Sequence, residues 1–372
     1  MDVARALKSP AIFSMEEGRI MKKMLCSVFI GVFVLVVIAC KDERGSSLAS
    51  PEQQNAGGIA NALTHTAPVE YTPDIRVRTA HEIEVTRAEL IRYIFASPTL
   101  PDIQPQAAGD CLIVSMQNGF SSHMAVYRPL APNGALVIYH DGHEGYTARD
   151  ATVIHRFVAE GYTVWRLDMP LIGDNRQPVV VDLPRVGPVP IWQHEQMMYL
   201  EDITAGSPVR YFLDPVIAAV NLAQARGFRD IFMVGLSGGG WTTTLAAALD
   251  TRIVASYPVA GSVPLAMRFD RYRKNWGDWE QVIPDLYRIA SYEDLYIMGA
   301  QQRSQMQVLN QYDICCFNEP RYALYEQVVQ EVLRSIGGEF HVLWSEGDFI
   351  HWANPAAVDR ILDDMRLRRE AR

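Results

Sequence analysis

The chain has 372 residues, of which 49% are hydrophobic, so it is long enough to bury a large core. Its 34 Lys and Arg residues are outnumbered by 43 Asp and Glu residues, and the formal net charge of −9 argues against a nucleic-acid partner. The five cysteines show no C-x-x-C spacing and no H-E-x-x-H motif is present, so the sequence predicts no bound metal.

The N-terminus has the pattern of an export signal. Lys22 and Lys23 precede the uncharged, apolar residues 24–39, a run shorter than the about 20 residues that a membrane span needs. This run ends directly before Cys40, and its last residues resemble the lipobox of bacterial lipoproteins, in which a small residue precedes the modified cysteine. The resemblance implies that residues 1–39 are removed as a signal peptide and that Cys40 is lipidated.

The export signal leaves two points open. An uncleaved membrane anchor is the alternative interpretation of residues 24–39, and Met21 or Met24 is an alternative start of translation. Both interpretations export the rest of the chain to the cell envelope, with the N-terminal anchor as its membrane contact. In a Gram-negative host, this location is the periplasm or the outer membrane.

Residues 40–73 are rich in Ser, Gln, Asn, Ala and Gly and lack apolar periodicity, which predicts a flexible tether. Residues 74–372 are then expected to form a single domain. Its first element is a helix predicted at residues 86–96, where four apolar side chains recur at helical spacing: Leu90, Ile91, Ile94 and Phe95.

Strand-like and helix-like runs alternate after residue 110, which predicts an α/β fold with a mostly parallel central sheet and helices on both faces. The expected strands are residues 111–116, 123–127, 135–139, 163–167, 231–234, 253–258, 306–309 and 340–344, with the first two as an antiparallel pair. The expected helices are residues 147–160, 211–225, 241–249, 322–336 and 355–365.

The longest connection, residues 170–208, contains six prolines and is expected to form a rim or cap over a site at the edge of the sheet. Its aromatic and methionine side chains, with four later tryptophans, are candidates for lining a pocket there, with packing in the core as the alternative for each aromatic: Trp192, Met197, Met198, Tyr199, Trp241, Trp276, Trp279 and Trp352. A second segment, around Asp285 and Asp294, is predicted to be a lid or surface loop because Pro284 opens an acidic and aromatic run.

The most informative motif is Gly235-Leu236-Ser237-Gly238-Gly239, which lies between the apolar residues 231–234 and a predicted helix. This is the G-x-S-x-G nucleophile elbow, in which a strand turns sharply into a helix and exposes a serine hydroxyl. The flanking glycines lack the side chains that would collide in so tight a turn. The alternative interpretation is a glycine-rich turn whose serine only caps the helix.

A serine nucleophile needs a general base, and in this fold the order along the chain is Ser, acid, His. His351 is the candidate base, because it lies in the loop after the last predicted strand. His341, its competitor late in the chain, falls inside that strand. The alternative for His351 is a surface histidine without a catalytic role.

Asp313 is the candidate acid, because it follows the penultimate strand and can orient the His351 ring. Asp348 is the rival, although it lies only three residues from His351 in one short loop. Cys315 and Cys316, which follow Asp313, are expected to be two packed thiols, with a vicinal disulfide as the alternative.

A tetrahedral intermediate also needs two backbone amides as an oxyanion hole. The amide of Gly238, next to Ser237, is one expected donor. The other is expected from Gly142 or His143, in the loop after residues 135–139. This loop is like the His-Gly loops of esterases, although Asp141 replaces one of their glycines.

Residues 110–365 resemble an α/β-hydrolase of the serine esterase type. The pattern G-x-S-G-G-G-x-x-T at residues 235–243 is similar to bacterial acetyl xylan esterases and to dienelactone-hydrolase-like groups. Dienelactone hydrolases proper use a cysteine nucleophile, and this chain has Ser237 instead. The resemblance implies a Ser237–Asp313–His351 triad, an acyl-enzyme intermediate, no cofactor, and a small-molecule or carbohydrate ester as substrate.

Two other functions remain open at the level of the sequence. A serine peptidase of the prolyl-oligopeptidase type shares the elbow and the triad order, but its large N-terminal domain has no counterpart in residues 40–110. A catalytically silent binding lipoprotein on the same scaffold is the third hypothesis. The presence of all three triad residues favours the exported ester hydrolase.

Overall fold

The computed structural model describes residues 71–270, 273–274, 276–347 and 349–371. The predicted signal peptide, Cys40 and all of the predicted tether before residue 71 lie outside the described residues. Tyr71 belongs to the domain, because its hydroxyl donates a hydrogen bond to Glu293 Oε1 at 2.7 Å. No helix in the described part of the chain is long and apolar enough to cross a membrane.

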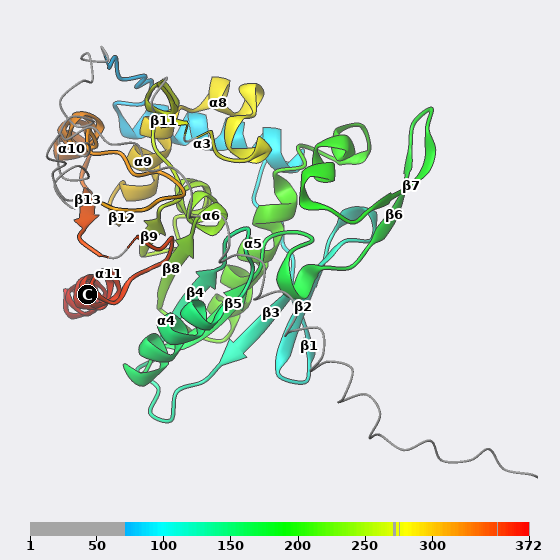
Figure 1. Ribbon diagram of the computed structural model, residues 1–372, viewed down its shortest axis with the longest axis horizontal. Helices are drawn as coiled ribbons and strands as arrows, with labels where there is room; N and C mark the ends of the chain where they lie inside the picture. Colours follow the sequence, from blue (N-terminus) through cyan, green and yellow to red (C-terminus); the bar gives the residue numbers. More distant parts are fainter. Residues whose placement is uncertain (1–70, 271–272, 275, 348, 372) are drawn as a thin grey trace, which may run out of the picture. The chain divides into compact units, whose positions relative to one another are not determined.

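A nine-stranded sheet forms the centre of the domain, with the order β1-β2-β3-β5-β4-β8-β9-β12-β13 (Figure 1). Strands β1 to β3 are antiparallel and β3 pairs antiparallel with β5, whereas every later pair in this order is parallel. The mostly parallel sheet and its leading antiparallel pair are therefore confirmed. The bounds are β1 Gln106–Ala108, β2 Cys111–Ser115, β3 Ser121–Tyr127, β4 Ala135–His140, β5 Thr163–Leu167, β8 Asp230–Leu236, β9 Ala255–Val259, β12 Ser304–Asn310 and β13 Glu339–Ser345.

The helices largely follow the predicted pattern. Among the described residues, the long helices are α3 Ala80–Phe95, α4 Ala148–Ala159, α5 Arg210–Ala225, α6 Gly238–Leu249, α10 Ala323–Ile336 and α11 Pro355–Glu370. Helix α3 begins before the predicted residue 86, because Thr79 and Glu82 form a capping box around its first turn. The shorter elements are η1 Gln117–Gly119, η2 Gly173–Asn175, η3 His194–Ile203, α7 Leu265–Arg268, η4 Trp279–Val282, α8 Pro284–Ile289 and α9 Tyr292–Ala300.

The sheet is covered on both faces, and its strands alternate between two apolar cores. In β4, Leu136 and Ile138 belong to one core, whereas Val137 and Tyr139 belong to the other. Helices α3, α5, α6, α9 and α10 contribute to the first core, and α4 and α11 to the second, which Figure 1 shows on opposite sides of the sheet. Because the strands from β5 to β13 in this order are parallel, their carboxyl ends lie at one edge of the sheet, where the loops that follow them meet.

Residues 170–208 contain η2, the antiparallel hairpin of β6 (Val179–Leu183) and β7 (Gly187–Ile191), and η3. The hairpin projects from the domain in Figure 1. A third, smaller apolar core holds this segment against the domain: Phe120, Leu171, Val181, Ile191, Met197, Leu200 and Tyr211.

The prediction of a lid or surface loop around Asp294 is wrong. Residues 292–300 form helix α9, and every residue of this helix is buried. Asp294 accepts hydrogen bonds from the backbone amides of Arg76 (2.8 Å), Val77 (3.1 Å) and Ser291 (3.0 Å). Its carboxylate therefore caps α9 and holds the backbone of residues 76 and 77 against this helix. The acidic residue is thus part of the buried core.

Replacing Asp294 with alanine is expected to lower the free energy of unfolding by about 2–4 kcal/mol, because it leaves several buried amides without an acceptor. The activity of the molecules that remain folded should not change. Urea denaturation measures the free energy of unfolding, and kcat per titrated active site measures the activity of the folded molecules.

Asp285→Ala is the matched control. Asp285 lies on α8, is exposed, and pairs with the exposed Arg288 one helical turn away. Its replacement should change the unfolding free energy by no more than about 0.5 kcal/mol. Equal effects of the two substitutions would contradict the assignment of Asp294 to the core.

Candidate active site

Ser237 occupies a strained turn between β8 and α6. Its backbone has φ 56° and ψ −120°, in the left-handed half of conformational space that side chains other than glycine rarely adopt. A Cβ on Gly235 would lie 2.1 Å from Gly239 O, and one on Gly239 would lie 2.2 Å from His140 O. Both glycines are therefore required by contact, as the motif predicts.

The loop after β4 packs directly against Ser237. A Cβ on Gly142 would lie 2.8 Å from Ser237 Cβ and 3.0 Å from Leu236 O, so only glycine permits this approach. The amides of Gly142 and His143 donate no hydrogen bond to any described residue. The amide of Gly238, in the first turn of α6, has no partner within the helix. Three unengaged donors therefore lie around the serine.

Asp141, which stands where similar loops have a glycine, holds this loop in place. Its carboxylate is buried and accepts a hydrogen bond from Arg166 Nη1 at 2.8 Å. Arg166 Nη1 also lies 3.1 Å from Asp168 Oδ2. Burial raises the pKa of Asp141 despite the neighbouring guanidinium. The hydrogen bond from Arg166 thus ties Asp141, and with it the loop, to strand β5.

Asp313 and His351 are brought together from two different loops. Asp313 follows β12 and His351 lies between β13 and α11, and the Asp313 Oδ2 to His351 Nδ1 distance is 2.7 Å. Asp313 Oδ1 accepts the amides of Cys315 (2.8 Å) and Cys316 (3.1 Å). Burial raises the pKa of Asp313, but the hydrogen bond and charge of His351 and these two amides outweigh burial, so the net shift is downward.

The rival base, His341, does not make this contact in the structure. His341 lies in β13, and burial lowers its pKa. Asp348 lies outside the described residues. Asp285 and Asp294, the other acids of this part of the chain, are engaged in the surface pair and the helix cap described above.

Ser237 and His351 line one cavity of about 340 Å³. His351 Nε2 is buried and makes no hydrogen bond to any described residue. Ser237 and His351 therefore line the same cavity without a hydrogen bond between them. Catalytic hydrogen bonds are often long before substrate binds. The cavity is lined by Gly142, His143, Glu144, Gly145, Thr147, Arg149, Asp150, Leu236, Ser237, Trp276, Gly277, Asp278, Gln281, Cys315, Cys316, Phe317, His351 and Trp352.

The eight candidate pocket residues divide between the cavity, the cores and the surface. Of the eight candidate side chains, only Trp276 and Trp352 line the cavity, and no residue of 170–208 does. Met197 and Trp241 are fully buried in the cores, because the helical turns that carry them face the interior. Three others are exposed and do not line the cavity: Trp192, Met198 and Tyr199.

Cys315 and Cys316 form a vicinal disulfide and are not the two packed thiols that the sequence predicts. The turn that directs both of their amides to Asp313 also brings the two sulfur atoms together. Both residues line the cavity, so the disulfide forms part of its wall beside His351.

Sequence reasoning missed a polar cluster beside the cavity. His143 Nε2 lies 3.2 Å from Glu280 Oε1 and 3.3 Å from Asp278 Oδ2, and His194 Nε2 lies 3.5 Å from Glu280 Oε2. Burial raises the pKa of Glu280, but the two imidazoles beside it outweigh that effect and bring the pKa down to about 2. These four residues come from three distant parts of the chain, so no local motif could have revealed them.

A family model described as PhoPQ-activated pathogenicity-related protein matches residues 215–347, a range that includes Ser237 and Asp313 and ends before His351. A comparison with the sequences of curated proteins found no match.

Several solved structures share the architecture. The chain is similar to an acetyl xylan esterase from Paenibacillus sp. R4, at 14% identity and a TM-score of 0.50, over 80% of this chain and 98% of that chain. Acetyl xylan esterase 1 from Thermoanaerobacterium sp. matches at 14% identity and a TM-score of 0.51, over 81% of this chain and 97% of that chain. A glucuronoyl esterase of carbohydrate esterase family 15 from Caldicellulosiruptor kristjansonii matches at 14% identity and a TM-score of 0.50, over 83% and 93%. These similarities show the α/β-hydrolase fold.

Proposed function

We propose that this protein is a serine hydrolase that cleaves carboxylic esters through an acyl-enzyme intermediate. The observation that carries the proposal is the Asp313–His351 hydrogen bond, which leaves His351 Nε2 without a hydrogen-bond partner among the described residues, while His351 and Ser237 line the same cavity. Because Asp313 accepts the proton of Nδ1, the neutral imidazole has its lone pair on Nε2. That atom is the one that a serine hydroxyl needs as its base.

In the proposed mechanism, Ser237 Oγ attacks the ester carbonyl carbon while its proton passes to His351 Nε2. The carbonyl oxygen becomes an oxyanion, and the unengaged amides of Gly238 and of Gly142 or His143 stabilise it. Collapse of the intermediate breaks the bond to the alcohol, which takes the proton from His351. Water, deprotonated by His351, then attacks the acyl-enzyme and releases the acid and Ser237.

We propose a carbohydrate ester as the substrate class. The support is the wall of the cavity, where the side chains of Trp276 and Trp352 can pack against a sugar ring or an acyl group. Three similar structures are named as esterases of acetylated xylan or of glucuronoyl groups. From the sequence of residues 1–40, we further propose export and lipid anchoring at Cys40.

Hydrolysis of a series of p-nitrophenyl esters, from acetate to long acyl chains, tests the proposed activity. Turnover of short esters, with kcat/KM falling as the chain outgrows the cavity, is the expected result. A folded protein that hydrolyses no ester but cleaves peptide amides would favour the peptidase alternative. Failure to turn over either class would favour a silent binding protein.

Gly142→Ala is expected to lower kcat by about 100-fold, because the new Cβ forces the loop away from Ser237 and displaces an oxyanion donor. Gly109→Ala is the control, because it also strains the backbone, at a φ of 64°, but its Cβ would meet no atom within 4 Å and Gly109 does not line the cavity. Steady-state kinetics and thermal unfolding of both variants separate activity from stability. Full activity in Gly142→Ala would contradict the proposed place of the oxyanion hole.

A further inference from the structure

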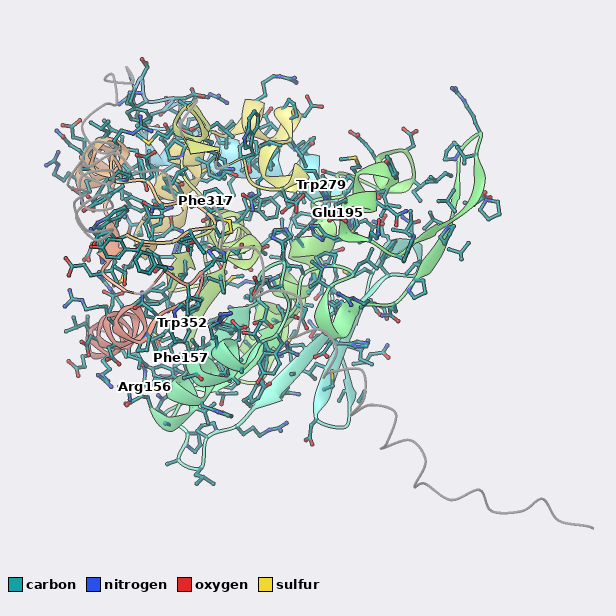
Figure 2. The ribbon with its side chains drawn as sticks, in the orientation of Figure 1. Arg156, Phe157, Glu195, Trp279, Phe317 and Trp352 are labelled. Carbon is teal, nitrogen blue, oxygen red and sulfur yellow. A yellow bond between two sulfur atoms is a disulfide. The ribbon has the colours of Figure 1, made fainter. Side chains whose placement is uncertain are left out.

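The cluster of His143, His194, Asp278 and Glu280 lies at one wall of the cavity and has two different surroundings. His143 and Asp278 line the cavity, whereas His194 and Glu280 are buried behind them. Figure 2 labels Trp279 of η4 close to Glu195 of η3, the two elements that carry Glu280 and His194. The four residues offer one ligand atom each, and these atoms all lie within 4.8 Å of one another.

Two buried atoms of the cluster lack hydrogen-bond partners. His194 is 4% exposed and Glu280 is fully buried, yet His194 Nε2 and Glu280 Oε2 form no hydrogen bond to any described residue. Buried polar atoms are normally satisfied, so a missing partner needs an explanation. The two atoms face each other at 3.5 Å.

The orientation of His194 is fixed by its other nitrogen. His194 Nδ1 lies 3.0 Å from the carbonyl oxygen of Pro170, which can only accept a hydrogen bond. Nδ1 therefore carries a proton, and Nε2 is the ring nitrogen directed at the carboxylate of Glu280. Metal-binding histidines have this arrangement, in which a carbonyl holds the distal nitrogen and orients the ring. Two carboxylates and two imidazoles together offer a divalent cation both negative charge and nitrogen ligands.

The spacing of the cluster fits a tetrahedral ion. Ligands bound at about 2.0–2.1 Å in a tetrahedron lie about 3.3–3.4 Å apart. The corresponding contacts here are 3.2 Å and 3.3 Å from His143 Nε2 to the two carboxylates, and 3.5 Å from His194 Nε2 to Glu280.

We propose that His143, His194, Asp278 and Glu280 bind a divalent first-row transition metal ion, with Zn²⁺ as the best match. Two imidazole nitrogens with two carboxylates suit Zn²⁺ and its neighbours, whereas Mg²⁺ and Ca²⁺ prefer oxygen ligands alone. The expectation of no metal came from local spacing, and these ligands are not local. The site goes beyond the proposed function, which needs no metal.

The ion would position the loop that borders Ser237. A Cβ on Gly238 would lie 2.5 Å from His143 Cε1, so the His143 ring packs tightly against the residue that follows the nucleophile. Holding Nε2 on a metal fixes this ring and the adjacent amides. His143 is then a positioning residue that acts through the oxyanion loop.

Metal content tests the proposal independently of activity. The full-length protein is treated with EDTA, incubated with Zn²⁺, passed through gel filtration and measured by atomic emission, with Mg²⁺ in a parallel sample. We expect one Zn²⁺ per chain and no retained Mg²⁺. Asp278→Asn and His143→Gln are expected to weaken Zn²⁺ binding by at least about tenfold. Both residues are partly exposed, so these variants should fold.

His155→Ala serves as the matched control, because His155 is an exposed histidine on α4 outside the cluster. Ser237→Ala should also keep the ion, because Ser237 is not one of the proposed ligands. The metal content therefore tests the site independently of the esterase activity. Absence of Zn²⁺ from the folded protein would overturn the proposal. So would Zn²⁺ binding that is unchanged in Asp278→Asn and His143→Gln.

Discussion

Replacing Ser237 with alanine is expected to lower kcat for ester hydrolysis by about 10⁴- to 10⁶-fold. The substitution removes only the Oγ atom, and the strained turn that carries it is held by Gly235, Gly239 and the β8–α6 packing. Stability should therefore change little. The amides around residue 237 remain, so a residual rate above that of uncatalysed hydrolysis should persist.

Ser115→Ala provides the control for this experiment, since Ser115 is an exposed serine at the end of β2. Its kcat should equal that of the unmodified protein. Steady-state kinetics with p-nitrophenyl acetate, on variants shown to be folded by circular dichroism, measures both. Ester hydrolysis that persists in Ser237→Ala would mean that another group is the nucleophile.

Asp313→Asn is expected to lower kcat by about 10⁴-fold through the wrong tautomer of His351. The amides of Cys315 and Cys316 donate to Oδ1, so the asparagine must keep its carbonyl oxygen there. Its NH₂ group then takes the place of Oδ2, which faces His351 Nδ1. Nδ1 must accept this hydrogen bond, and the ring proton moves to Nε2. A protonated Nε2 cannot take the proton of Ser237.

Asp348→Asn is the matched comparison, because Asp348 is the other acid that the sequence offers next to His351. Its effect on kcat should be small. The lowered pKa of Asp313 keeps its carboxylate ionised throughout the neutral range, so the loss in Asp313→Asn should not depend on the pH of a neutral assay. A large loss in Asp348→Asn with a small one in Asp313→Asn would reverse the assignment of the acid.

Much of the fold could be predicted because its signals are local. Apolar runs such as residues 135–139 and 163–167 coincide with β4 and β5, and the glycines around Ser237 are required by contacts within one turn. The contact between Asp313 and His351 could be predicted because loops at the carboxyl ends of parallel strands converge on one edge of the sheet. The order of strands and loops along the chain was therefore enough to predict that two residues of different loops lie close together.

The features that sequence reasoning missed depend on tertiary contacts. The acidic residues in the first turn of helix α9 favoured a surface segment, but Asp294 is buried because it caps the helix and accepts hydrogen bonds from the amides of residues 76 and 77. Trp241 was a candidate for the pocket, yet the face of α6 that carries it packs in the core. The approach of His143 to Glu280 spans 137 positions, so no pattern of spacing could have revealed it.

Labelling with a fluorophosphonate tests the central claim most directly, because this probe phosphonylates an activated serine and releases fluoride. Mass spectrometry of the digested protein should find one adduct per chain, on the peptide that contains Ser237. The adduct should be absent in Ser237→Ala and much slower to form in Asp313→Asn. A folded protein that takes up no label, or that carries it on a different residue, would contradict the assignment of Ser237 as an activated nucleophile.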